Sequence, residues 1–278
     1  LFRSNTAEAA GMIGAKTYYN AVRSGGKMTE QRIPWSIRDE SKTGLADWFA
    51  GRFDQVFFNQ VCGYTAETRT KYTGLNAVTA PSSSRRITAG AGTTDEAITS
   101  GDTFTLNLID QAVEMAKVGA NMVQPVRIGG QKKYCMYLHP YQVTSLRTNS
   151  SSGQWLDIQK AAMAGMDSKM SPIYTGALGE YNGVILRSSQ DITNGVNSST
   201  GAAITTVKRA VLLGAQSACM ATGQMTTGAN KYRWNEELLD HKRKLEVSAW
   251  SIWGIKKTVF NAADFGTVVV SSYAAAST

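Results

Sequence analysis

One stretch of the sequence constrains the fold more than any other, the segment from Ser36 to Val61 that Cys62-Gly63 follows. Its apolar residues recur at spacings of three and four, and charged residues fill most of the other faces. The pattern predicts an amphipathic helix over 36–62, roughly 40 Å long, with Ser36 or Asp39 as its N-cap. A helix more than twice the average length is typical of a rod laid across a sheet. The stripe comprises Leu45, Trp48, Phe49, Phe53, Val56, Phe57 and Val61.

The other segments predict shorter helices and widely separated strands, which together indicate an α+β fold. Residues 12–19 carry a weak helical pattern, and the polar residues 64–103 predict a long surface excursion or hairpin. Helices are expected at 104–118, capped by Asp102 or Thr103, and at 141–147, 155–165 and 214–222. A strand is expected after Pro125, and a glycine-rich loop through Pro172 and Gly176. Further strands are expected at 132–138, 183–187, 207–213, 244–260 and 267–271.

The charge is basic but scattered. Lysine and arginine outnumber acidic residues by 29 to 21, a formal net charge of +8. The densest cluster is 242–244, with Lys256 and Lys257 downstream, and acidic residues lie among these cations. This mixture favours a surface that meets other protein subunits over a dedicated nucleic-acid site. The three cysteines are far apart and indicate buried free thiols.

The sequence contains no motif that indicates catalysis. The pattern predicts a hydrogen-bonded turn histidine at His139 and a solvated one at His241. Nucleophile-elbow, phosphate-loop and zinc-ligand spacings are missing from the sequence. We therefore expect no enzyme activity, no catalytic residues, no metal site and no cofactor. No apolar run reaches 18 residues, so we expect no membrane span. Six tryptophans, 11 tyrosines and ten methionines suit a protein that works through contact.

Several blocks, in order along the chain, resemble the major capsid protein family of phage N-four and its relatives. They span about residue 24 to residue 270, whereas residues 1–22 fit the family poorly. The blocks are Gly26-Lys27-Met28-Thr29-Glu30-Gln31-Arg32, Arg38-Asp39-Glu40, Leu45-Ala46-Asp47-Trp48, Asp54, Phe58-Asn59-Gln60, Tyr137-Leu138-His139-Pro140-Tyr141-Gln142-Val143, Gly153-Gln154-Trp155-Leu156-Asp157-Ile158-Gln159-Lys160-Ala161-Ala162, Gly176-Ala177-Leu178-Gly179-Glu180-Tyr181-Asn182-Gly183-Val184 and Leu213-Gly214-Ala215-Gln216-Ser217.

The resemblance implies a tailed-phage capsid fold of the Hong Kong 97 type. In that fold a peripheral domain carries a long spine helix, and an axial domain points to the centre of the capsomer. Carried over, residues 1–25 are the remnant of an N-terminal arm and extended loop, and 26–103 form the peripheral domain with its spine helix at 36–62. Residues 104–230 form the axial domain, and 231–278 supply return strands to the peripheral domain.

The resemblance also implies a function. We expect a structural major capsid protein of a tailed, podovirus-like phage, forming pentamers and hexamers of an icosahedral shell around double-stranded DNA. Its location would be the virion, assembled in the host cytoplasm. Expected partners are copies of itself, cement or decoration proteins, the portal protein and, non-specifically, packaged DNA. Arg85 and Arg86 are the candidate inter-subunit contacts, because arginine forms bidentate bridges across such seams.

Two other functions stay open at this point. A bacterial encapsulin-type compartment would share the fold and enclose an enzyme instead of a genome. An unrelated hydrolase or nucleic-acid-binding protein would be a monomer of 30.0 kDa, active on a substrate or on short DNA.

Overall fold

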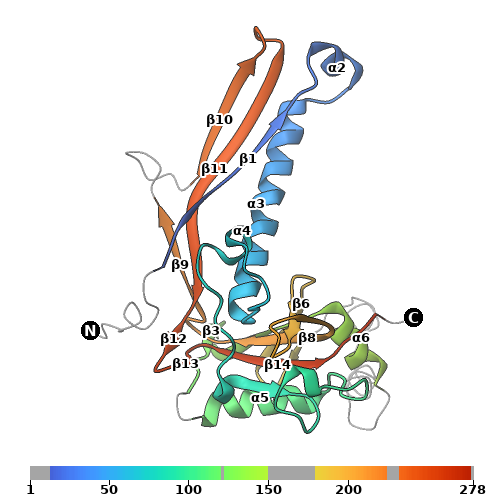
Figure 1. Ribbon diagram of the computed structural model, residues 1–278, viewed down its shortest axis with the longest axis vertical. Coiled ribbons are helices and arrows are strands. Elements are labelled where there is room, and N and C mark those ends of the chain that lie inside the picture. The colour runs from blue at the N-terminus through green and yellow to red at the C-terminus, as the bar shows by residue number, and fades with distance from the viewer. Residues whose placement is uncertain (1–12, 120–121, 150–178, 224–231, 277–278) are drawn as a thin grey trace.

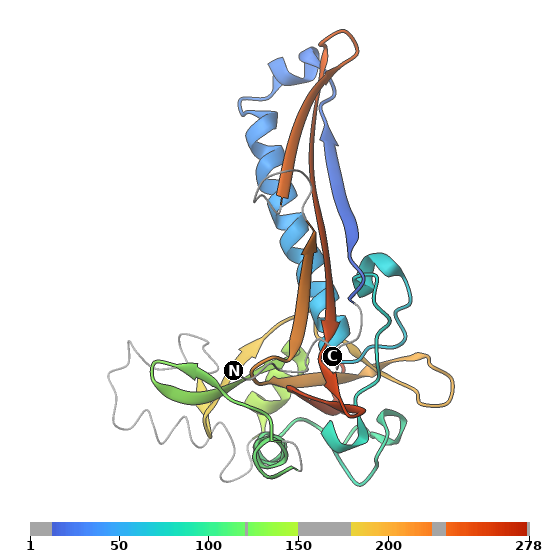
Figure 2. The same cartoon turned by 90° about the vertical axis from the view of Figure 1, so that its left-hand side faces the viewer.

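The chain forms an upright arm that stands on a wider base (Figures 1 and 2). The structure is a computed structural model that describes residues 13–119, 122–149, 179–223 and 232–276. Helices and strands both build it, which confirms the predicted α+β class. The arm consists of α3 (Ile37–Val61), β1 (Lys16–Arg23), β9 (Ala218–Gly223), β10 (Tyr232–Leu239) and β11 (Lys244–Lys257), with α2 (Lys27–Arg32) at its tip.

Helix α3 confirms the predicted rod to within one residue at each end. The Ser36 side chain accepts a hydrogen bond from the backbone of Asp39, at 3.4 Å, and two carboxylates occupy the first turn, where the helix dipole favours them. Gly63 follows the helix with a φ of 65°, a left-handed conformation that glycine adopts without strain. The predicted boundaries therefore correspond to real start and stop signals.

The arm sheet is antiparallel, in the order β1-β11-β10, with β9 on another stretch of β11. Tyr18 on β1 stacks on Trp253 of β11, with ring centroids 4.1 Å apart. Two predictions fail here, because 12–19 and 214–222 were expected to be helical and instead contribute strands β1 and β9. Both strands pair antiparallel with β11, so tertiary pairing overrides a weak local helical pattern.

The hairpin of β10 and β11 also departs from expectation. No strand was predicted at 232–239, and β11 ends at Lys257, three residues before the predicted end. Three consecutive residues with positive φ, Asp240 to Lys242, form the turn between the two strands. Two more residues with positive φ, Asn261 and Ala262, connect two short strands, β12 (Val259–Phe260) and β13 (Ala263–Asp264). These short strands follow the end of the long strand β11.

The base is an eight-stranded mixed sheet in the order β2-β14-β8-β4-β6-β5, with β3 on β4 and β7 on β8. Its helices α5 and α6 confirm two predictions, although Thr105 and not Asp102 or Thr103 is the N-cap of α5. The predicted strands at 132–138, 183–187, 207–213 and 267–271, and the strand after Pro125, are also confirmed. Their bounds are β2 (Arg86–Thr88), β3 (Val126–Ile128), β4 (Gln131–Leu138), β5 (Glu180–Tyr181), β6 (Val184–Ser188), β7 (Asn194–Val196), β8 (Ala203–Leu213) and β14 (Thr267–Tyr273), with α5 (Leu106–Val118) and α6 (Pro140–Thr148).

Both faces of the base sheet are covered. On one face, Ala210 and Leu212 of β8 pack into a large apolar core shared with α5. On the other face, Val211 and Leu213 contact Phe58 and the C-terminal end of α3. Because side chains of a strand alternate between faces, β8 connects the core of the base to the foot of the arm.

The segment 64–103 crosses from arm to base as an excursion, and it does not form a hairpin with itself. It contains α4 (Thr70–Thr73), two 3-10 turns, η1 (Ser83–Arg85) and η2 (Asp95–Ala97), and β2, which runs parallel to β14. The base sheet thus joins strands from three of the four predicted chain segments, 26–103, 104–230 and 231–278. The predicted helix 155–165 and the loop through Pro172 and Gly176 lie outside the described residues.

Candidate subunit interface

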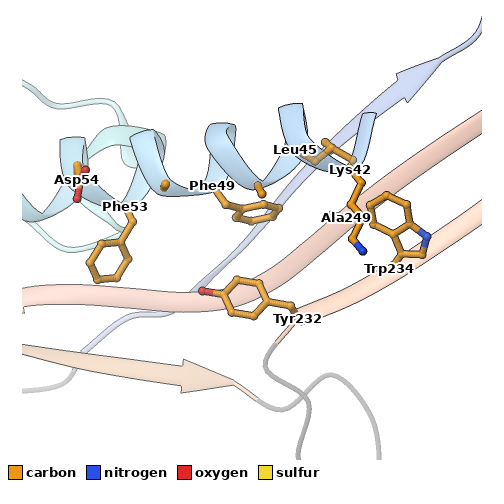
Figure 3. A pocket seen from close by; sticks show the side chains of 10 residues that line it. Lys42, Leu45, Phe49, Phe53, Asp54, Tyr232, Trp234 and Ala249 are labelled. Carbon is orange, nitrogen blue, oxygen red and sulfur yellow. The ribbon is translucent and has the colours of Figure 1, made fainter. Parts of the chain in front are cut away.

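An apolar groove of about 620 Å³ runs between α3 and β10 on the arm. Figure 3 shows Phe49 and Phe53 of α3 facing the same space as Tyr232 and Trp234 of β10. Phe49 meets Tyr232 edge-on, with centroids 5.8 Å apart. The two β10 aromatics are still 57% and 39% exposed, although aromatic side chains gain most from burial. Exposed aromatics clustered on an open groove are typical of a surface made for protein contact.

The opposite face of the arm sheet carries exposed aromatic rings among charged and polar side chains. Ala249 lines the groove on the α3 side, so its neighbour Trp250 points to the other face. Trp250 pairs directly with Tyr19 of β1, and these side chains are 37% and 71% exposed. The guanidinium of Arg233 lies 5.8 Å from the Trp250 ring. The arm therefore presents aromatic surface on both sides of a thin sheet.

A third surface combines cations with an aromatic ring where α4 meets α3. The Tyr72 ring lies 4.4 Å from the Arg52 guanidinium, 4.5 Å from that of Arg69 and 4.9 Å from the Lys71 ammonium. A hydrogen bond with Arg52, together with the positive charge of Lys71, lowers the pKa of the Tyr72 hydroxyl. Lys16 lies next to them, with its Nζ donating to Thr70 at 2.9 Å. We call Lys16, Arg52, Arg69, Lys71 and Tyr72 the basic cluster.

A fourth surface is acidic. A shallow hollow of about 480 Å³ near the N-terminal end of α3 is lined by Asp39, Glu40 and Asp47, together with Trp35, which is 57% exposed. Within the described residues these three carboxylates take part in no salt bridge. We call this set the acidic ridge.

Two buried ion pairs fix the arm to the base at an elbow. Arg209 of β8 binds Asp95 at 2.7 Å, and its Nη1 donates to the Gly63 carbonyl at 2.6 Å, just beyond the end of α3. Lys257, at the end of β11, binds Asp264 at 2.8 Å. Its Nζ also donates to the Thr79 carbonyl at 3.1 Å. Each charge is nearly or completely excluded from solvent, so each needs its partner.

The sequence reasoning did not identify this elbow. Lys257 was grouped with a scattered basic surface, yet its side chain is fully buried. Arg209 had one available signal, since it and Lys208 interrupt the apolar residues of the strand Val207 to Leu213. A charged residue in such a strand is rarely tolerated without a buried partner.

The two predicted contact arginines occupy different environments. Arg85 is 2% exposed, and its Nη1 donates to the Met115 carbonyl of α5 at 3.1 Å. Arg86 is half-buried and donates to the Thr93 carbonyl in the same excursion. The structure places them next to each other in the chain but does not bring them to a shared surface. Their role between subunits stays a prediction.

His139 is the hydrogen-bonded turn histidine that the sequence predicted. It caps α6, with Nδ1 accepting from the backbone of Tyr141 at 3.2 Å. Burial, together with the positive charge of Lys208, lowers its pKa to about 4. In contrast, His241 is exposed in the turn between β10 and β11.

In the portion of the chain that the structure describes, no three metal-ligating side chains converge. No helix there is both long enough and apolar enough to cross a bilayer. The elongated arm, its contact surfaces and its firm elbow define a structural subunit with the fold of phage capsid proteins, a class that comparison with known proteins supports. The chain belongs to the phage capsid protein family, whose model matches residues 12–276.

Individual relatives agree with this family assignment. The major capsid protein of Pseudomonas phage KPP25 is 25% identical over 282 residues, covering 90% of this chain and 71% of the relative. The capsid of Ralstonia phage GP4 superposes with a TM-score of 0.76 at 30% identity, covering 96% of this chain and 75% of that one. The chain is therefore a structural, non-enzymatic major capsid protein of a phage, and the assembled lattice of its relatives indicates assembly with copies of itself.

The encapsulin alternative receives much weaker support. An encapsulin complex from Synechococcus elongatus PCC 7942 is only 9% identical, with a TM-score of 0.50 over 94% of this chain and 74% of that one. That likeness shows a shared fold alone. The phage reading therefore stands.

Proposed function

We propose that the chain assembles into pentamers and hexamers of an icosahedral shell that encloses the double-stranded DNA of a tailed, podovirus-like phage. The main support is the arm, which carries aromatic surface on two faces and charged surfaces of both signs around α3. A subunit whose contact patches differ from one another suits heterologous contacts, and these close into rings. Several moderate contacts per subunit make such a lattice durable.

The proposal also assigns a role to each part of the chain. The arm would be the peripheral domain, with α3 as the spine helix of a Hong Kong 97-type subunit related to the phage N-four family. The base would supply most of the axial domain around the capsomer centre. Residues 1–25 would keep the role of a short N-terminal arm and extended loop, with β1 attached to the peripheral sheet.

Some partners belong to this proposal too. We include the portal protein, cement or decoration proteins and non-specific contact with packaged DNA, in a virion assembled in the host cytoplasm. Arg86 is the better of the two predicted inter-subunit arginines, because its side chain is only half-buried. Arg85 would act indirectly, by holding the excursion against α5 through Met115.

The experiment is expression of the full-length protein, followed by sedimentation and electron cryomicroscopy of the product. We expect closed particles with five-fold and six-fold capsomers, and DNA in particles recovered from infected cells. A chain that stays a 30 kDa monomer under conditions in which the GP4 capsid protein assembles would overturn the proposal. Particles that enclose a cargo enzyme and no genome would replace it with the encapsulin alternative.

A further inference from the structure

Around α3, the arm carries one surface of each sign, and neither can neutralise the other in the same subunit. Asp47 and Arg52 are five residues apart on the helix, so their side chains leave it roughly 140° apart. Glu40 and Arg52 are separated by roughly 18 Å along the axis, about twice the distance over which physiological salt screens charges. The acidic ridge and the basic cluster therefore face different neighbours.

Most charges on both surfaces form no salt bridge within the described residues. Lys16, Arg52 and Lys71 form no salt bridge with any carboxylate of the described chain, whereas Arg69 pairs with Glu67 at 2.7 Å. On the ridge, the three carboxylates likewise form no salt bridge with a described cation, although the charge of Asp39 acts on its neighbour Arg38. Isolated surface charges are ordinary, but two compact patches of opposite sign on one rigid helix are complementary surfaces.

Each patch also carries an aromatic side chain that would anchor a contact. Trp35 is 57% exposed beside the ridge. In the basic cluster, the Arg52 guanidinium lies between the rings of Tyr72 and Trp48, at 4.4 and 5.3 Å from their centroids. This stacking holds Arg52 in one orientation, which reduces the entropy lost on forming an ion pair.

We propose that the acidic ridge of one subunit docks on the basic cluster of the next subunit. The ligand of the basic cluster is thus a second copy of this chain, chosen because the complementary acidic surface is part of the same molecule. Because the two patches lie on different flanks of α3, the contact is heterologous and repeats around a ring. This inference rests on the proposed assembly into capsomers and assigns one of its contacts.

The test reverses the charges one patch at a time in the full-length protein. One variant carries Glu40→Lys and Asp47→Lys, a second carries Arg52→Glu and Lys71→Glu, and a third carries all four changes. Each two-residue reversal places like charges opposite each other and should lower the assembled fraction about tenfold. The four-residue variant restores opposite charges across the seam and should regain most of the assembly.

Controls separate this contact from folding and from general charge effects. Glu114→Lys and Lys117→Glu reverse exposed charges on α5, outside both patches, and should leave assembly unchanged. Circular dichroism and thermal unfolding of the unassembled variants report folding. The neutral pair Glu40→Gln and Asp47→Asn offers a milder version of the same test, in which assembly should weaken less than with reversal.

Several outcomes would overturn the inference. One is normal assembly of either two-residue variant, and another is a four-residue variant that assembles no better than its parents. A third is a basic-cluster variant that forms normal shells but retains less DNA, since the cluster would then serve nucleic acid. Failure of the proposed function looks different, because the unaltered protein and the α5 controls would then also fail to form particles.

Discussion

The base and the arm differ in where their apolar side chains lie. In the described part of the base, 20 buried residues form one apolar cluster between the sheet and its helices. Among the residues that the structure describes, the comparable cluster under the arm sheet contains only four buried residues, Tyr18, Val56, Trp253 and Ile255. Yet the arm carries Tyr19, Tyr232, Trp234 and Trp250 as exposed aromatics. The base is stabilised by its own interior, whereas much of the arm's apolar surface is left available to other molecules.

Because of this difference, we expect mutations in the base to affect the stability of the single subunit and mutations in the arm to affect its assembly. A buried side chain in the base contributes mainly to the folding of one subunit. A half-exposed side chain in the arm contributes less to that folding, and gains the rest of its burial only in the shell. Mutations in the base should therefore lower the free energy of unfolding most, and mutations in the arm should lower the assembled fraction most. Mutations at the elbow should lower both quantities.

The largest expected effect is at the elbow. Arg209→Ala leaves the Asp95 carboxylate buried without its partner, and this should lower the free energy of unfolding by about 3–5 kcal/mol. Urea denaturation of the unassembled chain measures it. The control, Arg243→Ala, removes an exposed ion pair with Asp240 and should change stability far less, because solvent screens exposed charges. Equal costs for the two variants would mean that the elbow does not join arm to base as described.

The next largest effect is expected from a comparison of one apolar side chain in the base with one in the arm. Leu212→Ala empties a fully buried site in the base and should cost about 2–5 kcal/mol. Phe49→Ala removes a half-buried ring from the groove of the arm and should cost about 1 kcal/mol in the single subunit. Denaturation gives these values, and sedimentation gives the assembled fraction. The contrast breaks down if Phe49→Ala assembles normally or destabilises the subunit as much as Leu212→Ala.

The smallest effect is a pH dependence located in the base. The folded-state pKa of His139 is lowered from 6.5 to about 4, so between these values the unfolded chain binds more protons than the folded chain. The contribution to stability is complete above pH 6.5 and is lost as the pH falls toward 4, by about 1–3 kcal/mol.

His139→Asn should remove this dependence, because asparagine caps a helix without titrating. Stability of the two proteins is compared between pH 4 and pH 7, so that carboxylate titrations common to both cancel. Hydrogen exchange should show that acid opens α6 and the base sheet before the arm, since His139 caps α6 in the base. An identical pH profile in the variant would contradict the role of His139.

The sequence predicted the fold best where local chemistry and tertiary structure agree. Helix α3 has a cap, an apolar stripe and a glycine stop, and strand β8 ends in an uninterrupted apolar run from Ala210 to Leu213. Both were identified. In contrast, β1 and β9 are specified by the partner strand β11, which local patterns do not reveal. The missed hairpin strand β10 has few buried residues, so it lacks the alternation that marks a half-buried strand.

The candidate contact surfaces were less predictable. Their residues come from segments far apart in sequence, such as Lys16, Arg52 and Lys71, which only the folded chain brings together. The adjacent pair Arg85 and Arg86 looked like a site because it is local, yet one of these side chains is buried against α5. Buried ion pairs such as Lys257 with Asp264 cannot be told from surface charges without knowing their surroundings.

The pairing of β1 with β11 has a consequence for how the subunit is made. These strands are separated by more than 220 residues, as the contact of Arg23 with Glu246 illustrates. During translation β1 stays unpaired until β11 has been synthesised, more than 220 residues later. The aromatic surfaces of the arm therefore exist only after β11 has joined β1 and β10, so a nascent chain that lacks β11 cannot offer them to a neighbour.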